Sequence, residues 1–261
     1  MNNMCATPNG ICCWEDINFK MAERNVKKLQ KRIKVAYTNK RYDVVINLQN
    51  TLIHSFYAKA LAVKIVSTND GKNTPGVDGI IWNTSELKFN AIKDLKRRGY
   101  KTKSLRRIYI PKSDGRVRPL SIPTMKDRAM QTLYRLALEP IAELTADECS
   151  YGYRIKRSAK DAILRCCDYL SEDSSLEWVL KLDIKSCFDT ISHEWLLSNI
   201  FIDKEILMKF LKCGYIDNSI LYPTLEGVPQ GGSISSILCN MTLDGLESMI
   251  VDTYGSQIHL I

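Results

Sequence analysis

The sequence predicts an α+β fold, because both helical and strand patterns occur along it. Apolar residues recur at helical spacing over residues 20–41, two short strands flank a turn at residues 113–115, and residues 178–184 alternate with a period of two. With 261 residues, 45% of them apolar, the chain can bury a core as one large domain or two smaller ones.

The charge balance points to an acidic partner. Lys and Arg number 37 against 29 Asp and Glu, a formal net charge of +8, which alone does not separate RNA, DNA and anionic membrane as the partner.

We predict neither a signal peptide nor a membrane span, because no long apolar run is free of charge. Nine cysteines, some in adjacent pairs, predict reduced thiols in the cytoplasm, and without C-x-x-C spacing a zinc site at Cys5, Cys12 and Cys13 is not expected.

Residues 20–41 form the first predicted helix, and it is strongly basic. Its apolar stripe includes Ala22, Val26 and Ile33, and Glu23 is its only acid. A charge run usually forms a solvated helix face, but with a single acid we favour a helix that binds phosphates. The cations of this prediction are Lys20, Arg24, Lys27, Lys28, Lys31, Arg32 and Lys34.

A second helix is expected over residues 42–65. The loop at residues 67–76 then collects most of the strong helix breakers of this region, so we place a boundary there.

Residues 105–120 predict a hairpin, and its register decides which of its cations share one face. Arg106 and Lys112 share one face of the first strand. A three-residue loop with Gly115 in the left-handed region would place Arg118 on that face, whereas a two-residue Asp-Gly loop would place it on the other. If the three cations bind one polyanion, the three-residue loop must form, so the register is a prediction derived from function. The alternative is an exposed edge hairpin charged against aggregation.

Two further helices have capping signals. Thr124 with Asp127 begins one, and Ser158 with Asp161 begins another that extends to about Leu170. Between them, residues 151–157 place tyrosines beside arginines, which can stack on bases and contact phosphates or can be core aromatics flanked by surface charge.

Residues 178–184 predict a strand that ends in a carboxylate. Trp178, Leu180 and Leu182 share one face, and Asp183 lies on the other. A carboxylate at a strand end suits a metal site, and it is also common as a turn residue. A glycine-rich loop at residues 226–236 allows a ligand to approach the backbone closely, although it could be an ordinary turn and lacks the P-loop pattern.

Five motifs occur in order: T-P-G-V-D-G at residues 74–79, I-P-K-S-D-G-R-V-R-P-L-S-I-P at 110–123, Y-G-Y-R at 151–154, the Asp183 segment, and G-V-P-Q-G-G at 227–232. Together they resemble group II intron reverse transcriptases over roughly residues 74–250. The resemblance implies a right-hand polymerase, with a basic helical RNA-binding extension at residues 1–73, fingers at 74–175 and a partial palm at 176–261. It implies an RNA-directed DNA polymerase and intron maturase that acts in splicing and retrohoming, with intron RNA, an RNA template, a DNA primer and dNTP as partners.

By this resemblance, Asp183 is similar to the first metal-binding carboxylate of the family. The backbone carbonyl of Ile184 is expected as a further ligand in a site for two Mg²⁺ ions, which prefer oxygen donors. Arg106, Lys112 and Arg118 resemble the cations that bind the triphosphate.

Other positions resemble the family's nucleotide and RNA contacts. Phe188 is similar to the bulky side chain that excludes a ribose 2′-hydroxyl, and Gln230 with Gly231 resembles the loop beside the incoming nucleotide. Tyr153 and Arg154 are expected to contact RNA together with the basic helix.

The sequence also departs from the family pattern. Cys187 and Ser233 stand where an aromatic residue and a proline are usual, and Ile155-Lys156 replaces Pro-Gly. A Tyr-Ala-Asp-Asp-like box is expected beyond Ile261, so the 261 residues are expected to bind intron RNA without polymerising, and an uncovered palm could pair with a second copy. The alternatives are a non-enzymatic RNA-binding splicing factor and an RNA-copying RNA polymerase, against which Phe188 argues.

Overall fold

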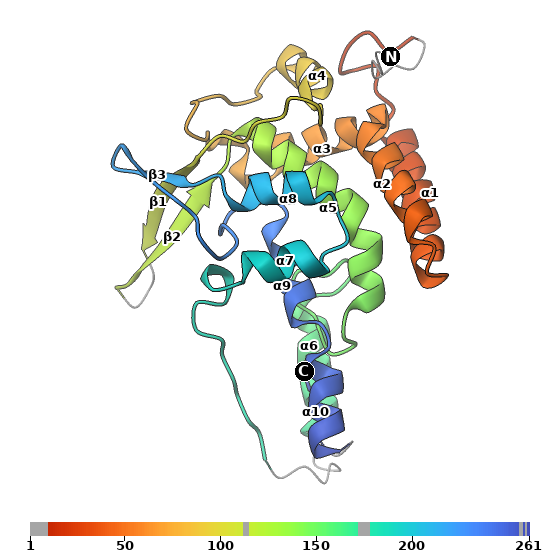
Figure 1. Cartoon of the computed structure of the whole chain (residues 1–261), viewed down its shortest axis with the longest axis vertical. Helices are drawn as coiled ribbons and strands as arrows, with labels where there is room; N and C mark the ends of the chain where they lie inside the picture. Colours follow the sequence, from red (N-terminus) through yellow and green to blue (C-terminus); the bar gives the residue numbers. More distant parts are fainter. Residues whose placement is uncertain (1–9, 112–114, 172–177, 256–257, 259) are drawn as a thin grey trace.

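Four helices form the centre of the molecule in the computed structural model, which describes residues 10–111, 115–171, 178–255, 258 and 260–261. They are α1 (Phe19–Thr38), α2 (Tyr42–His54), α3 (Phe56–Thr68) and α5 (Met125–Thr145), and α5 packs against the other three. Figure 1 shows how these helices are arranged. A single apolar core of buried residues runs through them, from Ile17 to Cys239. The remaining helical elements are η1 (Asp70–Asn73), α4 (Ser85–Asp94), α6 (Ala159–Tyr169), η2 (Cys187–Asp189), α7 (His193–Asn199), α8 (Lys204–Leu211), α9 (Ser235–Leu243) and α10 (Leu246–Tyr254).

The predicted helix over residues 42–65 is two helices, so that prediction was wrong. Ser55 has an extended backbone (φ −64°, ψ 130°) and serves as the C-cap of α2 and the N-cap of α3. Its carbonyl accepts the amide of Lys59 at 3.1 Å. The Ser55 side chain makes no capping hydrogen bond, so the break is a change of backbone conformation, which the spacing of apolar residues does not indicate.

The breaker-rich loop at residues 67–76 is firmly attached to α5. The guanidinium of Arg128, 5% exposed, donates to the carbonyl of Gly71 at 2.8 Å and also to that of Thr74. A Cβ on Gly76 would lie 2.6 Å from the backbone of Thr124, so this contact requires glycine. The loop therefore lies against the start of α5 and is not a free linker.

The sheet has four strands in the order β2-β1-β3-β4. Strand β1 (Leu105–Pro111) is antiparallel to β2 (Val117–Ile122) and parallel to β3 (Tyr215–Asp217), which pairs with β4 (Ile220–Tyr222). The hairpin is confirmed, and it brings residues near 105 beside residues near 215.

Both predicted capping signals are confirmed. The hydroxyl of Thr124 accepts the amide of Asp127 at 3.1 Å at the start of α5. Ser158 and Asp161 form a capping box at the start of α6. Both α6 and α10 extend away from the helical core toward the lower end of the view (Figure 1).

The strand predicted at residues 178–184 does not form. The segment has no sheet partner among the described residues, and its apolar side chains are exposed, with Trp178 90% and Leu180 81% accessible. A strand is stabilised by hydrogen bonds to a neighbour, and the described sheet lies elsewhere in the fold. The sequence has the alternating pattern of a strand, but no other described segment pairs with it.

None of the described helices combines the length and the apolar character needed to cross a membrane.

Candidate functional site

The glycine-rich loop is joined to the segment that follows Asp183 by three hydrogen bonds. The amide of Val228 donates to the carbonyl of Phe188 at 2.7 Å, and the amide of Gly227 donates to that of Ile191 at 2.8 Å. The Nε2 atom of His193 lies 2.7 Å from the carbonyl oxygen of Gly227, so this ring nitrogen carries the donated proton. The loop and the Phe188 segment therefore form one unit.

Gly227 allows the close approach between these two segments. Its φ is +79°, and a Cβ there would lie 2.6 Å from the carbonyl oxygen of Asp189. Any other residue would meet both backbone strain and a clash.

The far end of the loop lies along the free edge of β2. The carbonyl of Gln230 accepts the amide of Ser121 at 2.8 Å, and a Cβ on Gly231 would lie 2.8 Å from the carbonyl oxygen of Ser121. The amide of Ser233 donates to the Gln131 side chain on α5 at 2.8 Å. Hairpin, loop and Phe188 segment are thus connected through backbone atoms.

The hairpin register places Arg106 and Arg118 on one face. Ile110 pairs with Arg118 and has the same parity as Arg106, as the three-residue loop requires, and Gly115 has the left-handed φ of +79°. Leu120 shares that face and contacts Gly231, because a Cβ on the glycine would lie 3.2 Å from its side chain. The predicted register is confirmed, while Lys112 lies outside the described residues.

The opposite face of the hairpin contributes an arginine that the sequence reasoning missed. The guanidinium of Arg107 lies 3.9 Å from the centre of the Tyr215 ring, and its buried Nε has no hydrogen-bond partner among the described residues. Arg107 and Tyr215 line a cavity of about 370 Å³ together with Ser121, Asp189 and Gln230. The strand alternation that assigned Arg106 to one face also assigns Arg107 to the other.

The residues nearest the expected metal are exposed. Asp183 lies on the extended segment, and the side chain of Ile184 is 51% exposed. Phe188 is half-buried, and its ring meets that of Tyr153 edge-on, with centroids 6.3 Å apart and an interplanar angle of 88°. The fold thus brings together two predicted site residues, Phe188 and Tyr153, that are far apart in sequence.

The carboxylates of the described residues do not fit a pair of divalent ions. No group of three or more His, Cys, Asp or Glu side chains converges in the described part of the chain. Asp183 and the Ile184 carbonyl provide fewer oxygen donors than two Mg²⁺ ions require.

The basic helix α1 presents its cations to solvent. All seven predicted cations, from Lys20 to Lys34, are exposed, and none forms an ion pair within the part of the chain that the structure describes. Three of them line a groove of about 1,110 Å³ between α1 and α2, and Arg41 and Tyr57 line it as well. The three are Lys28, Lys31 and Arg32. The opposite side of the helix buries Ala22, Val26, Ile33 and Ala36.

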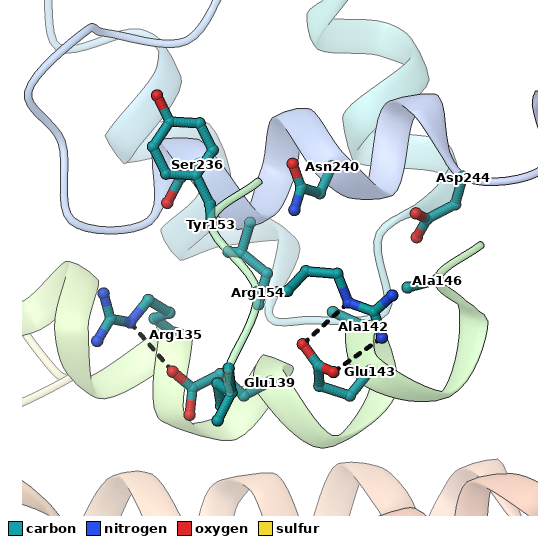
Figure 2. Close-up of a pocket in the computed structure, with 12 residues that line it drawn as sticks. Arg135, Glu139, Ala142, Glu143, Ala146, Tyr153, Arg154, Ser236, Asn240 and Asp244 are labelled. Carbon is teal, nitrogen blue, oxygen red and sulfur yellow. Dashed lines mark hydrogen bonds and ion pairs between the residues drawn. The ribbon is translucent and has the colours of Figure 1, made fainter. Parts of the chain in front are cut away.

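The side chain of Arg154 is buried and bonded within the protein, not exposed to solvent. Figure 2 shows its guanidinium directed at Glu143, to which it donates at 2.9 Å. It also donates to the carbonyl of Asp147 at 2.8 Å, and its side chain is only 8% exposed. These contacts favour the structural interpretation for Arg154, while Tyr153 beside it is 75% exposed.

Two family models match the chain. The N-terminal domain of reverse transcriptase matches residues 14–95, and reverse transcriptase (RNA-dependent DNA polymerase) matches residues 110–261. The chain belongs to the reverse transcriptase family. Such proteins are RNA-directed DNA polymerases that use divalent metal ions.

Curated relatives identify the branch of the reverse transcriptase family. Protein YkfC of Escherichia coli (strain K12) is 35% identical over 210 residues, which cover 76% of this chain and 55% of the relative. Group II intron-encoded protein LtrA of Lactococcus lactis subsp. cremoris is 34% identical over 200 residues, 73% of this chain and 33% of the relative. The putative COX1/OXI3 intron 2 protein of Saccharomyces cerevisiae is 34% identical over 196 residues, which cover 72% of this chain and 22% of the relative.

The predicted resemblance to group II intron-encoded reverse transcriptases is confirmed by these matches. The chain spans about half the length, or less, of these three relatives.

Proposed function

We propose that the protein acts as a group II intron-encoded reverse transcriptase and maturase, which copies RNA into DNA and assists splicing and retrohoming of its intron. The observation that carries this proposal is the connection of hairpin, glycine-rich loop and Phe188 segment through backbone hydrogen bonds. It supports the proposal because it ties together the hairpin that carries Arg106 and Arg118, the glycine-rich loop and the segment that carries Phe188.

Each of these groups has a chemical role in the proposal. Arg106 and Arg118, with Lys112, bind the triphosphate, because guanidinium forks match phosphate oxygens. Phe188 excludes a ribose 2′-hydroxyl, and Gln230 with Gly231 borders the nucleotide. Asp183 and the Ile184 carbonyl would supply only part of the oxygen ligands of a Mg²⁺ site, and a complete site would stabilise negative charge on the phosphates.

We propose further that the 261 residues alone do not polymerise, because Asp183 is a single carboxylate where two ions need several. In this assignment residues 74–175 are fingers and residues 176–261 are part of the palm. The cytoplasm suits the protein because its thiols stay reduced there.

Helix α1, within the extension at residues 1–73, is proposed to bind intron RNA. Its cations are exposed and free of ion pairs within the described residues, and a groove with an aromatic side chain runs beside them. Phosphate contacts supply affinity, whereas a stacking tyrosine and a shaped groove can add selectivity.

Binding of a structured group II intron RNA and of a scrambled RNA of equal length, each titrated from about 50 to about 500 mM salt, tests this proposal. Tighter intron binding that persists at high salt supports maturase-type recognition. Equal binding that falls steeply with salt would show that these residues supply charge alone.

A non-enzymatic splicing factor is the second candidate, favoured by the exposed position of Asp183. Primer extension by the longest natural form of the protein separates the two. DNA synthesis that is lost in Asp183→Asn, with RNA binding retained, supports the enzyme. RNA binding and splicing assistance without any synthesis supports the factor.

A second copy of the chain is a further proposed partner, because Trp178, Leu180 and Leu182 form an uncovered apolar segment. Sedimentation at micromolar concentration tests it, and a monomer would exclude this partner.

A further inference from the structure

Two thiols lie in contact beside the proposed nucleotide site. The Sγ atoms of Cys187, in η2, and Cys239, in α9, are 3.6 Å apart, although 52 positions separate them in the sequence. A disulfide bond is about 2.05 Å long, so the sulfur atoms need to approach each other by only about 1.5 Å. Cys187 is half-buried and Cys239 is 4% exposed.

We propose that Cys187 and Cys239 form a site of oxidative modification, at which a low-molecular-weight disulfide such as oxidised glutathione converts the two thiols into one intramolecular disulfide. This inference does not depend on the proposed polymerase function. It rests on the distance between the sulfur atoms and on their different access to solvent.

The exchange proceeds in two steps. The Cys187 thiolate attacks one sulfur of oxidised glutathione, which forms a mixed disulfide and releases one glutathione. Cys239 then loses its proton and attacks the Cys187 sulfur, which releases the second glutathione. Two protein thiols are oxidised to one disulfide, one glutathione disulfide is reduced, and the two protons pass to the released glutathione thiolates.

Exposure sets the order of these steps. Burial, together with the neighbouring Cys187, raises the pKa of the Cys239 thiol to about 12. A thiol of this kind is a poor first nucleophile toward an external oxidant. The more accessible Cys187 therefore reacts first, and Cys239 attacks only when the mixed disulfide is held beside it.

The new bond would restrain the segment between Asp183 and Phe188. Cys187 lies between Ser186, whose φ is +53°, and Phe188, whose carbonyl accepts the amide of Val228. A covalent link from Cys187 to α9 fixes this turn to a core helix. Backbone amides of residues 185–190 should then exchange more slowly with solvent in the oxidised protein.

The test uses a variant in which Ser replaces five of the other cysteines, so that their thiols do not compete; these are Cys5, Cys12, Cys13, Cys166 and Cys167. After treatment with oxidised glutathione, we expect a mass loss of about 2 Da and a Cys187–Cys239 linked peptide, both reversed by dithiothreitol. We also expect a higher Tm for the oxidised form, because the crosslink constrains the unfolded chain.

Matched variants decide the assignment. Cys187→Ser and Cys239→Ala should each abolish the linked peptide and the Tm shift, whereas Cys149→Ser should leave both unchanged. Cys187→Ser should in addition remove most glutathione adduct, and Cys239→Ala should retain it as a stable mixed disulfide. Should a variant fail to fold, the peptide map of the parent protein still decides. A map with persistent adduct at Cys187, or without a Cys187–Cys239 peptide, would overturn the proposal.

Discussion

The ring of His193 holds the carbonyl oxygen of Gly227 at 2.7 Å and so joins the start of α7 to the glycine-rich loop. His193 is 6% exposed, and this contact lies in the interior of the protein. The same loop reaches β2 through Gln230, so His193 and Ser121 hold it at two points.

Replacing His193 by Phe should destabilise the fold by about 1–3 kcal/mol, because the Gly227 carbonyl would remain buried without this donor. Urea unfolding followed by circular dichroism measures the change. His193→Gln should recover part of the loss, since its amide can donate to the same oxygen. The exposed His54→Gln serves as control and should change stability by less than about 0.5 kcal/mol. Equal effects of His193→Phe and His54→Gln would contradict the role of the hydrogen bond.

Gly227 and Gly245 form a matched pair for separating clash from backbone strain. Both have positive φ, +79° and +94°, but a Cβ at Gly245 would meet nothing within 4 Å. Gly245→Ala should cost about 1–2 kcal/mol from the left-handed backbone alone. Gly227→Ala should cost about 1–3 kcal/mol more, because its Cβ meets the Asp189 backbone. Similar losses in the two variants, measured by chemical denaturation, would show that the loop moves away freely.

The cations of α1 should dominate binding to RNA. Changing Arg24, Lys27 and Lys31 together to Gln should weaken binding by roughly tenfold or more and reduce the log–log salt slope by about 2. Filter binding across a salt series measures both quantities. The control changes Lys96, Arg98 and Lys101 to Gln, which removes the same charge elsewhere. An equal loss in the control would indicate that only net charge matters.

Asp244 should make stability fall as pH rises. Its pKa is raised to about 6, mainly by burial and also by repulsion from Asp147, while a hydrogen bond from Thr145 opposes the shift. The folded state therefore binds more protons than the unfolded state between about pH 4 and pH 6, so the free energy of unfolding decreases across that window. Because Asp244 is partly solvated, we expect a change of about 1 kcal/mol. Asp244→Asn should remove this pH dependence, and the exposed Asp252→Asn should not.

Phe188 should control the choice of sugar in the longest natural form of the protein. Phe188→Ala should reduce discrimination against ribonucleotides by about tenfold or more, equivalent to about 1.4 kcal/mol. A competition assay with dNTP and rNTP measures it. The control is Phe201→Ala, because Phe201 packs against Tyr37 and Tyr42, away from the loop. Unchanged discrimination in Phe188→Ala would remove this residue from sugar selection.

Local signals in the sequence predicted the parts of the fold that depend on neighbouring residues. The caps at Thr124 and Ser158 and the buried stripe of α1 follow from spacing within a few residues. The hairpin register did not, because the spacing allowed two loop lengths and the choice came from the assumption that Arg106 and Arg118 bind one polyanion. The break at Ser55 was missed because the apolar spacing continues across it, and spacing shows which face is buried but not where a helix is interrupted.

Contacts between distant segments could not be predicted in the same way. Arg128 binds Gly71, and His193 binds Gly227, across 57 and 34 positions of sequence. Residues 178–184 have the alternation of a strand, yet alternation only specifies which faces a strand would have. A partner must come from elsewhere in the fold, and periodicity carries no information about it.

The packing of α5 has a consequence for synthesis of the chain. Three of its main partners, α1, α2 and α3, precede it in sequence, and α9 is the one that follows. The helical core can therefore close on the ribosome once α5 has emerged, before Asp183, Phe188 and the glycine-rich loop have been translated. The later residues would then be added to a scaffold that is already folded.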